Sequence, residues 1–67
     1  MELSARNQLS GVVTAIKLGD ILAEVTVDVS GQTVISVITR GSAERLHLQV
    51  DDPVTVIVKS TEVMLAK

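Results

Sequence analysis

Three short stretches of the chain combine a basic side chain with hydroxyl or amide groups, and each borders an apolar segment. They are residues 4–7 (SARN), 39–42 (TRGS) and 59–61 (KST). A tetrahedral oxyanion only accepts hydrogen bonds, so a pocket for it needs many donors and no nearby carboxylate. Solvated loops and strand ends contain the same residue types, so the residues alone leave that interpretation open as well. If these stretches bind a ligand, the chemistry that they suit is the binding of a dianion.

No arrangement typical of catalysis accompanies these stretches. The chain has no cysteine, and its four glycines are too widely spaced to form a phosphate-binding loop. The carboxylates Glu24, Asp28 and Glu62 are expected on solvent-facing surfaces. The only histidine, His47, has no evident catalytic partner in the sequence. We therefore expect a binding protein and not an enzyme.

The length of 67 residues predicts one domain, residues 1–67, with a small core. Domains of this size usually need disulfides, a structural metal or partner subunits, and a chain with no cysteine and one histidine lacks the first two. Hydrophobic residues make up 46% of the chain without any Phe, Tyr or Trp, so the core must consist of small aliphatic side chains, which suit β-sheet. We expect an oligomer with no stable folded monomer.

Composition also argues against two classes of partner. The net charge is −2 and no aromatic side chain is available for base stacking, whereas nucleic-acid-binding proteins usually combine a basic surface with stacking groups. No apolar run is long enough to span a membrane, and residues 1–7 do not resemble a secretion signal. We expect a cytoplasmic protein that binds neither nucleic acid nor membrane.

Short apolar segments separated by glycine and proline predict five strands and one helix. The expected strands are residues 9–17, 21–29, 32–39, 54–59 and 63–66. Gly19-Asp20 is expected to form a type II′ hairpin turn, and Ser30-Gly31 a second tight turn. Residues 41–48 break the alternation and predict a short helix, capped by Thr39 or Ser42.

Several of these strands are apolar on both faces. In residues 9–17, the alternation places Val13 and Ala15 on one face and Val12 and Ile16 on the other. Such strands cannot direct all their apolar side chains into one small core, so one face is expected to lie at a subunit interface. Five strands with a helix between the third and fourth predict an all-β, partly open Greek-key barrel of the oligonucleotide/oligosaccharide-binding (OB) type.

The three donor-rich stretches resemble, in order and spacing, the motifs of the molbindins, the Mop-type molybdate-binding proteins of the TOBE/Mop domain family. The similar segments are Ser4-Ala5-Arg6-Asn7 with Gly11, residues 37–46 around Thr39-Arg40-Gly41-Ser42, and residues 59–64. The resemblance therefore extends over almost the whole chain. His47 and the turn Asp51-Asp52-Pro53 depart from the family pattern, which leaves the geometry of that loop open.

This resemblance implies a homohexamer of OB-type barrels, a trimer of dimers, that holds molybdate or tungstate at subunit interfaces. The implied oxyanion-binding residues are Ser4, Ala5 and Arg6 from one subunit and Thr39, Ser42, Lys59 and Ser60 from its neighbour. Arg6 and Lys59 would supply positive charge, and the hydroxyl and main-chain N–H groups would donate hydrogen bonds.

The function implied by the resemblance is storage or buffering of the oxyanion in the cytoplasm. One alternative is a regulatory or structural interaction module whose assembly or partner binding responds to the oxyanion. A second alternative, oligonucleotide binding, follows from the fold alone, and a fold by itself does not specify a function.

Overall fold

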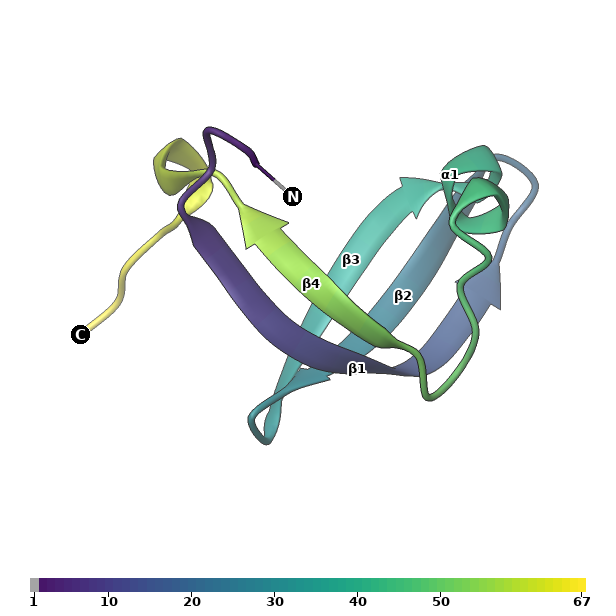
Figure 1. Ribbon diagram of the computed structural model, residues 1–67, viewed down its shortest axis with the longest axis horizontal. Coiled ribbons are helices and arrows are strands. Elements are labelled where there is room, and N and C mark those ends of the chain that lie inside the picture. The colour runs from purple at the N-terminus through teal and green to yellow at the C-terminus, as the bar shows by residue number, and fades with distance from the viewer. Residues whose placement is uncertain (1) are drawn as a thin grey trace.

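The computed structural model describes residues 2–67 as a strongly curved, four-stranded antiparallel sheet with one short α-helix (Figure 1). The strands are β1 (Asn7–Leu18), β2 (Leu22–Val29), β3 (Gln32–Thr39) and β4 (Pro53–Val58); the helix α1 is Arg40–Arg45 and a 3-10 turn, η1, is Ser60–Glu62. The strand order is β3-β2-β1-β4, which is the Greek-key order. The predicted all-β class, Greek-key topology and single short helix are confirmed.

The curvature of the sheet comes from β1, which pairs with two different strands along its length. Residues 7–12 pair with β4, and residues 12–18 pair with β2. The register with β2 shifts between Val13 and Ala15, which marks a β-bulge at Thr14. The predicted division of side chains in β1 is therefore wrong. The extra residue moves Ile16, and not Ala15, to the face that carries Val13 and packs on the core.

The core is small and entirely aliphatic. Val13 is completely buried and packs with Val25 and Val27, while Ala23 and Ala43 are also buried. The clean alternation predicted for β2 is confirmed. Gly11, two residues before Val13 on β1, has no room for a side chain. A Cβ atom there would lie 2.6 Å from Val27 Cγ1 and 2.9 Å from the main-chain oxygen of Asp28. Its missing side chain allows this part of β1 to lie close to the end of β2.

The two predicted hairpin turns have different outcomes. Ser30 and Gly31 both adopt positive φ, at 51° and 86°, and form a two-residue connection of the type I′ kind. The predicted type II′ turn at Gly19-Asp20 is wrong, because the connection has three residues and Gly19 does not adopt positive φ. The start of α1 explains the difference: Arg40 donates from its main-chain N–H to Ile21 O (2.8 Å) and from Nη1 to Gly19 O (3.2 Å), which fixes this loop.

The helix α1 begins as predicted and ends earlier. The Thr39 hydroxyl caps it by accepting a hydrogen bond from the Ser42 N–H (3.1 Å). At the other end His47 adopts φ 51°, its N–H donates to Glu44 O, and Leu48 N–H donates to Ala43 O. This pair of bonds is a Schellman motif, which usually has glycine at the left-handed position. The backbone of His47 therefore ends the helix.

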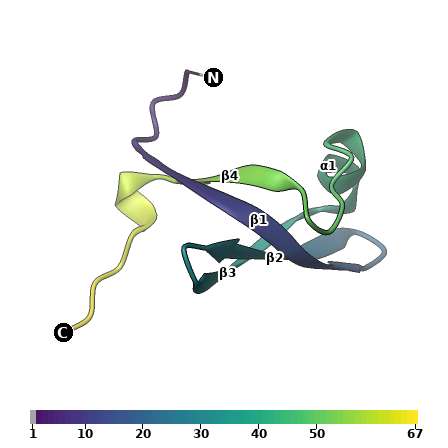
Figure 2. The same ribbon diagram turned by 60° about the horizontal axis from the view of Figure 1, so that its bottom comes forward.

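The predicted fifth strand, residues 63–66, is absent from the structure. The C-terminal segment leaves η1 and extends away from the sheet (Figure 2). Met64 and Leu65 are 91% and 93% exposed, so this segment has no buried face. The apolar composition suggested a strand, but a strand also needs a neighbour for its N–H and C=O groups. Within residues 2–67, no strand supplies one.

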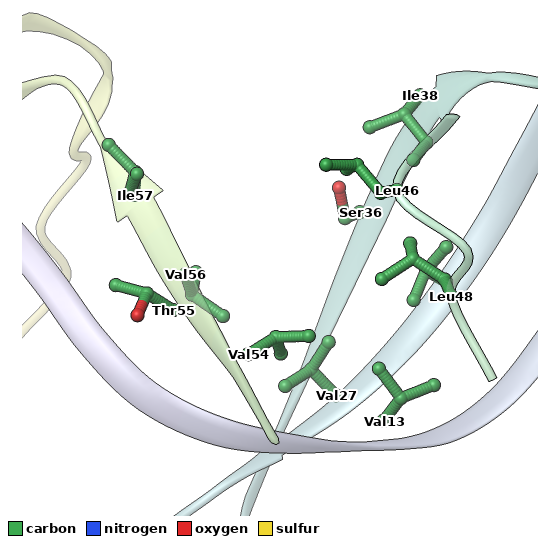
Figure 3. A pocket seen from close by; sticks show the side chains of 11 residues that line it. Val13, Val27, Ser36, Ile38, Leu46, Leu48, Val54, Thr55, Val56 and Ile57 are labelled. Atoms are coloured by element: carbon green, nitrogen blue, oxygen red, sulfur yellow. The ribbon is translucent and has the colours of Figure 1, made fainter. Parts of the chain in front are cut away.

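The curved sheet is not closed into a barrel. Its two edge strands, β3 and β4, face each other across an apolar pocket of about 180 Å³ (Figure 3). Val54 and Val56 line one side of it, and Ile38, Leu46 and Leu48 line the other. The outer face of β3 is also apolar, with Ile35 and Val37 51% and 62% exposed. The chain alone thus leaves apolar surface on both sides of its sheet, as the sequence predicts for an oligomer.

Candidate functional site

The first and last donor-rich stretches lie side by side because β1 and β4 are antiparallel partners. Asn7, the first residue of β1, pairs with Val58, the last residue of β4. The preceding residues 4–6 and the following residues 59–61 therefore leave the sheet at the same end (Figure 1). There they form a pocket of about 180 Å³, lined by Ser4, Ala5, Lys59, Ser60 and Thr61.

The local backbone positions the groups of this pocket, which we call the Lys59 pocket. Gln8 Nε2 donates to Ala5 O (3.0 Å), which holds the N-terminal stretch against the start of β1. On the other side, Glu62 N–H donates to Lys59 O (2.9 Å) and closes the 3-10 turn η1. No carboxylate lines the pocket. Its composition thus matches the needs of an anion, which accepts hydrogen bonds and repels acidic groups.

The third stretch forms a separate group at the junction of β3 and α1, the Ser42 cluster of Thr39, Ser42 and Arg45. The Thr39 hydroxyl lies 2.9 Å from Ser42 Oγ, and Arg45 Nη2 donates to the same oxygen at 3.0 Å. Both interactions are on the surface of the molecule. The cluster holds a hydroxyl and a cation next to each other, as anion binding requires.

The Lys59 pocket and the Ser42 cluster lie at opposite ends of the molecule. Both views show η1 and the N-terminal stretch at one end and α1 at the other (Figures 1 and 2). One chain therefore cannot bring all seven predicted residues to one ligand. Within one chain, β1–β4 pairing places Lys59 and Ser60 beside Ser4 and Ala5 and away from Thr39 and Ser42.

The basic side chains differ in how they are paired. Arg40 Nε forms a salt bridge with Glu44 Oε1 at 2.9 Å, the one salt bridge among residues 2–67. Arg6 and Lys59, the two predicted cations of the site, are exposed and have no carboxylate within 4.0 Å in that part of the chain. Arg45 likewise contacts Ser42 and no carboxylate. These three charges are thus available to an anion, whereas that of Arg40 is already partnered.

The sequence interpretation omitted two residues that the structure adds to these groups. Thr61 lines the Lys59 pocket. It belongs to the KST stretch of residues 59–61, but it was not among the predicted oxyanion-binding residues. Arg45 joins the Ser42 cluster from three positions later along α1. The helical spacing of three residues between Ser42 and Arg45 was the available signal, because such residues are neighbours on one helix face.

Residues 2–67 lack the features of two other kinds of site. Residues 2–67 contain no group of three or more His, Cys, Asp or Glu side chains that could hold a metal ion. Within the same range, no helix is long and apolar enough to cross a membrane.

Comparison with known proteins identifies the family to which this architecture belongs. The TOBE domain matches residues 3–65, which is nearly the full length of the chain. The chain is a member of the TOBE domain family. It is also 42% identical over 66 residues to molybdenum-pterin-binding protein 3 of Clostridium pasteurianum, and the similarity covers 97% of each chain.

Two further relatives show the same domain in different settings. A solved structure of a molybdate-binding protein from Sporomusa ovata superimposes on the TOBE domain with a TM-score of 0.96, at 36% identity and with full coverage of both chains. The molybdenum transport protein ModE of Azotobacter vinelandii is 42% identical over 66 residues, but these cover only 24% of its length. The domain thus occurs alone in some relatives and as a part of longer proteins in others.

Proposed function

We propose that this TOBE domain is a non-enzymatic protein that binds molybdate or tungstate and stores or buffers the oxyanion in the cytoplasm. The observation that carries the proposal is the division of the predicted site into two donor groups at opposite ends of one chain, one of which is a pocket that no carboxylate lines. Each group is half of an anion shell. The two halves join only when one copy places its Lys59 pocket against the Ser42 cluster of another copy.

The revised division assigns Ser4, Ala5, Arg6, Lys59 and Ser60 to one subunit and Thr39 and Ser42 to its neighbour. Arg6 and Lys59 offset the cost of removing water from a dianion, and the hydroxyl and N–H groups supply hydrogen bonds. The relatives support the nature of the ligand, because one is described as molybdate-binding and others as molybdenum-pterin-binding. The chain has no Phe, Tyr or Trp to stack on a pterin ring, so its donors fit the oxyanion and not the pterin.

Selection against sulfate follows from size. Molybdate and tungstate have longer bonds from the central atom to oxygen than sulfate has, so they fill a wider ring of donors. In the same ring, sulfate leaves donors unsatisfied, and each buried unsatisfied donor costs about 1–3 kcal/mol. Molybdate and tungstate are too similar in size to be separated by this means.

The binding of molybdate is tested by calorimetry and thermal denaturation of the wild-type protein. We expect saturable heat with molybdate and with tungstate, and little with sulfate at matched ionic strength. A ligand that binds only the folded protein stabilises it by an amount that grows with the logarithm of the ligand concentration above Kd, so millimolar molybdate should raise the melting temperature while sulfate hardly changes it. Equal stabilisation by both anions would show a general salt effect and contradict the proposal.

We propose further that the TOBE domain assembles as a homohexamer, a trimer of dimers. The exposed outer face of β3, the open pocket between β3 and β4, and the extended C-terminal segment provide the apolar surface for these contacts. Sedimentation equilibrium should find oligomers at low micromolar concentration, with folding and assembly lost together on dilution. A folded monomer under these conditions would contradict the assembly and, with it, the shared site.

The ModE relative favours a second candidate function, a regulatory or interaction module. In that relative the domain makes up about a quarter of a longer protein. Stoichiometry separates the two functions: storage predicts several anions for each oligomer and no stable protein partner. An oxyanion-dependent partner recovered at equal stoichiometry would favour the interaction module.

A further inference from the structure

The side chain of Gln8 ties residues 4–6, which we call the N-terminal rim of the Lys59 pocket, to the sheet. The rim precedes β1, so it takes no part in the β1–β4 ladder. Within residues 2–67, the bond from Gln8 Nε2 to Ala5 O (3.0 Å) is the only hydrogen bond that the rim forms. The hydrogen bonding that holds the rim in place therefore depends on Gln8.

The backbone of Gln8 is itself fixed by the sheet. Gln8 is the second residue of β1 and lies opposite Ile57 in the β1–β4 ladder. A carbonyl oxygen only accepts hydrogen bonds, so the side-chain NH2 group, and not the side-chain oxygen, faces Ala5. Gln8 thus acts from a rigid strand and reaches back three residues to the segment before it.

The bond to the Ala5 carbonyl also determines the direction of the next N–H group. None of the described peptide bonds is cis, so the C=O of Ala5 and the N–H of Arg6 lie in one plane and point in opposite directions. Because Ala5 O points at Gln8, the Arg6 N–H points away from Gln8. This N–H donates to no acceptor within residues 2–67. It is therefore an unpaired donor whose direction Gln8 sets.

Rotation of this peptide plane would reverse the polarity that the rim presents to a ligand. Ala5 lines the Lys59 pocket, so the plane between Ala5 and Arg6 lies at its border. A half-turn of the plane would exchange the positions of the N–H and the carbonyl oxygen. The carbonyl oxygen carries partial negative charge and only accepts hydrogen bonds, so it would repel an oxyanion. The bond from Gln8 opposes this rotation.

We propose that Gln8 is a positioning residue for oxyanion binding, which directs the Arg6 N–H toward the anion and keeps the Ala5 carbonyl away from it. The inference rests on the function proposed above and adds to it a residue that does not touch the ligand. A rim that is held before the anion arrives binds it more tightly, because less conformational entropy is lost on binding. Gln8 acts through residues 4–6 and not through a contact of its own.

A Gln8→Leu variant tests this role, because leucine is similar in size and has no donor. Gln8 and its bond to Ala5 are exposed, so the melting temperature without ligand should stay near that of the wild type. Molybdate affinity, measured by calorimetry, should fall about fivefold to tenfold, the effect of one lost hydrogen bond together with the cost of ordering the rim.

Gln32→Leu is the matched control for this variant. Gln32 is the first residue of β3, is exposed, and does not line the Lys59 pocket. Its replacement removes the same amide group from another strand of the sheet, so molybdate affinity should stay at the wild-type value. A loss confined to Gln8→Leu would show that the position of the amide matters and not the loss of a polar surface group.

The amide NMR resonance of Arg6 separates positioning from a general structural effect. In the wild type, titration with molybdate should move the Arg6 amide proton downfield, as expected for a new hydrogen bond to the anion. In Gln8→Leu at saturating molybdate, the same resonance should move less. A purely structural effect would instead change the resonances of the sheet in the ligand-free variant and leave the Arg6 response to molybdate as it is in the wild type.

Three results would overturn the inference while leaving the proposed function intact. They are wild-type molybdate affinity in Gln8→Leu, an equal loss of affinity in Gln32→Leu, and an Arg6 amide resonance that molybdate leaves unmoved in the wild type. The third measurement needs no variant, so it is decisive even if Gln8→Leu folds poorly. A wild-type protein that binds no molybdate would overturn the proposed function, and this inference with it.

Discussion

A Lys59→Ala variant is expected to bind molybdate about a hundredfold more weakly than the wild type while keeping its fold. Lys59 lines a pocket without carboxylates and has no salt bridge within residues 2–67, so its charge is not needed elsewhere in the chain. A hydrogen bond to a charged group contributes about 1.5–3 kcal/mol, and a tenfold change corresponds to about 1.4 kcal/mol. Arg6→Ala should have a similar effect.

Lys17→Ala is the matched control for these variants. Lys17 lies on the outer face of β1 opposite Glu24 of β2, so its removal changes the net charge equally without altering the Lys59 pocket. Calorimetry at one ionic strength should show near wild-type affinity for Lys17→Ala. Unchanged affinity in both Arg6→Ala and Lys59→Ala would reject the assignment of the site, and equal losses in all three would indicate a long-range charge effect.

A Gly11→Ala variant is expected to melt at a clearly lower temperature than the wild type. The added methyl group would lie 2.6 Å from Val27 Cγ1, 2.9 Å from Asp28 O and 3.0 Å from Val29 Cγ2. One of these neighbours is backbone, so rotation of a side chain cannot relieve the overlap. Overpacking in a core typically costs about 1–3 kcal/mol, which is a large part of the stability of a small domain.

A Gly41→Ala variant is expected to change the stability in the opposite direction. Gly41 lies within α1, and a Cβ atom there meets nothing within 4 Å. Alanine in place of glycine inside a helix stabilises by about 1 kcal/mol, so this variant should melt slightly above the wild type. Thermal denaturation followed by circular dichroism compares the two variants. A Gly11→Ala protein as stable as the wild type would show that β1 does not lie as close to Val27, Asp28 and Val29 as described.

The parts of the fold that depend on local patterns were predictable from the sequence. The alternation of β2 shows directly which side chains are buried, and Ser30-Gly31 combines residues that tolerate positive φ. The bulge at Thr14 has no such signal, because threonine is as common in regular strands as other β-branched residues. It becomes visible only when the register with β2 is known. The end of α1 was missed for a related reason, since His47 occupies a left-handed position usually taken by glycine.

The candidate site was predictable as a set of residues but not as an arrangement in space. Composition and motif order select Ser4, Arg6 and Lys59 without reference to any contact. Their grouping depends on the pairing of Asn7 with Val58, which no local pattern of either strand encodes. The same limit explains the incorrect strand at residues 63–66. Apolar composition indicates that a segment is to be buried, but it does not show whether the surface that buries it belongs to the same chain.

The placement of the two donor groups at opposite ends of the chain fixes a counting rule for the proposed site. Each copy has one Lys59 pocket and one Ser42 cluster. Every complete site therefore uses the Lys59 pocket of one copy and the Ser42 cluster of another. In any closed ring or symmetric particle, the number of complete sites of this kind therefore equals the number of chains. An arrangement that fails to close would instead grow into a filament with two unfilled ends. One anion for each chain is thus a signature of closure, whatever the number of subunits.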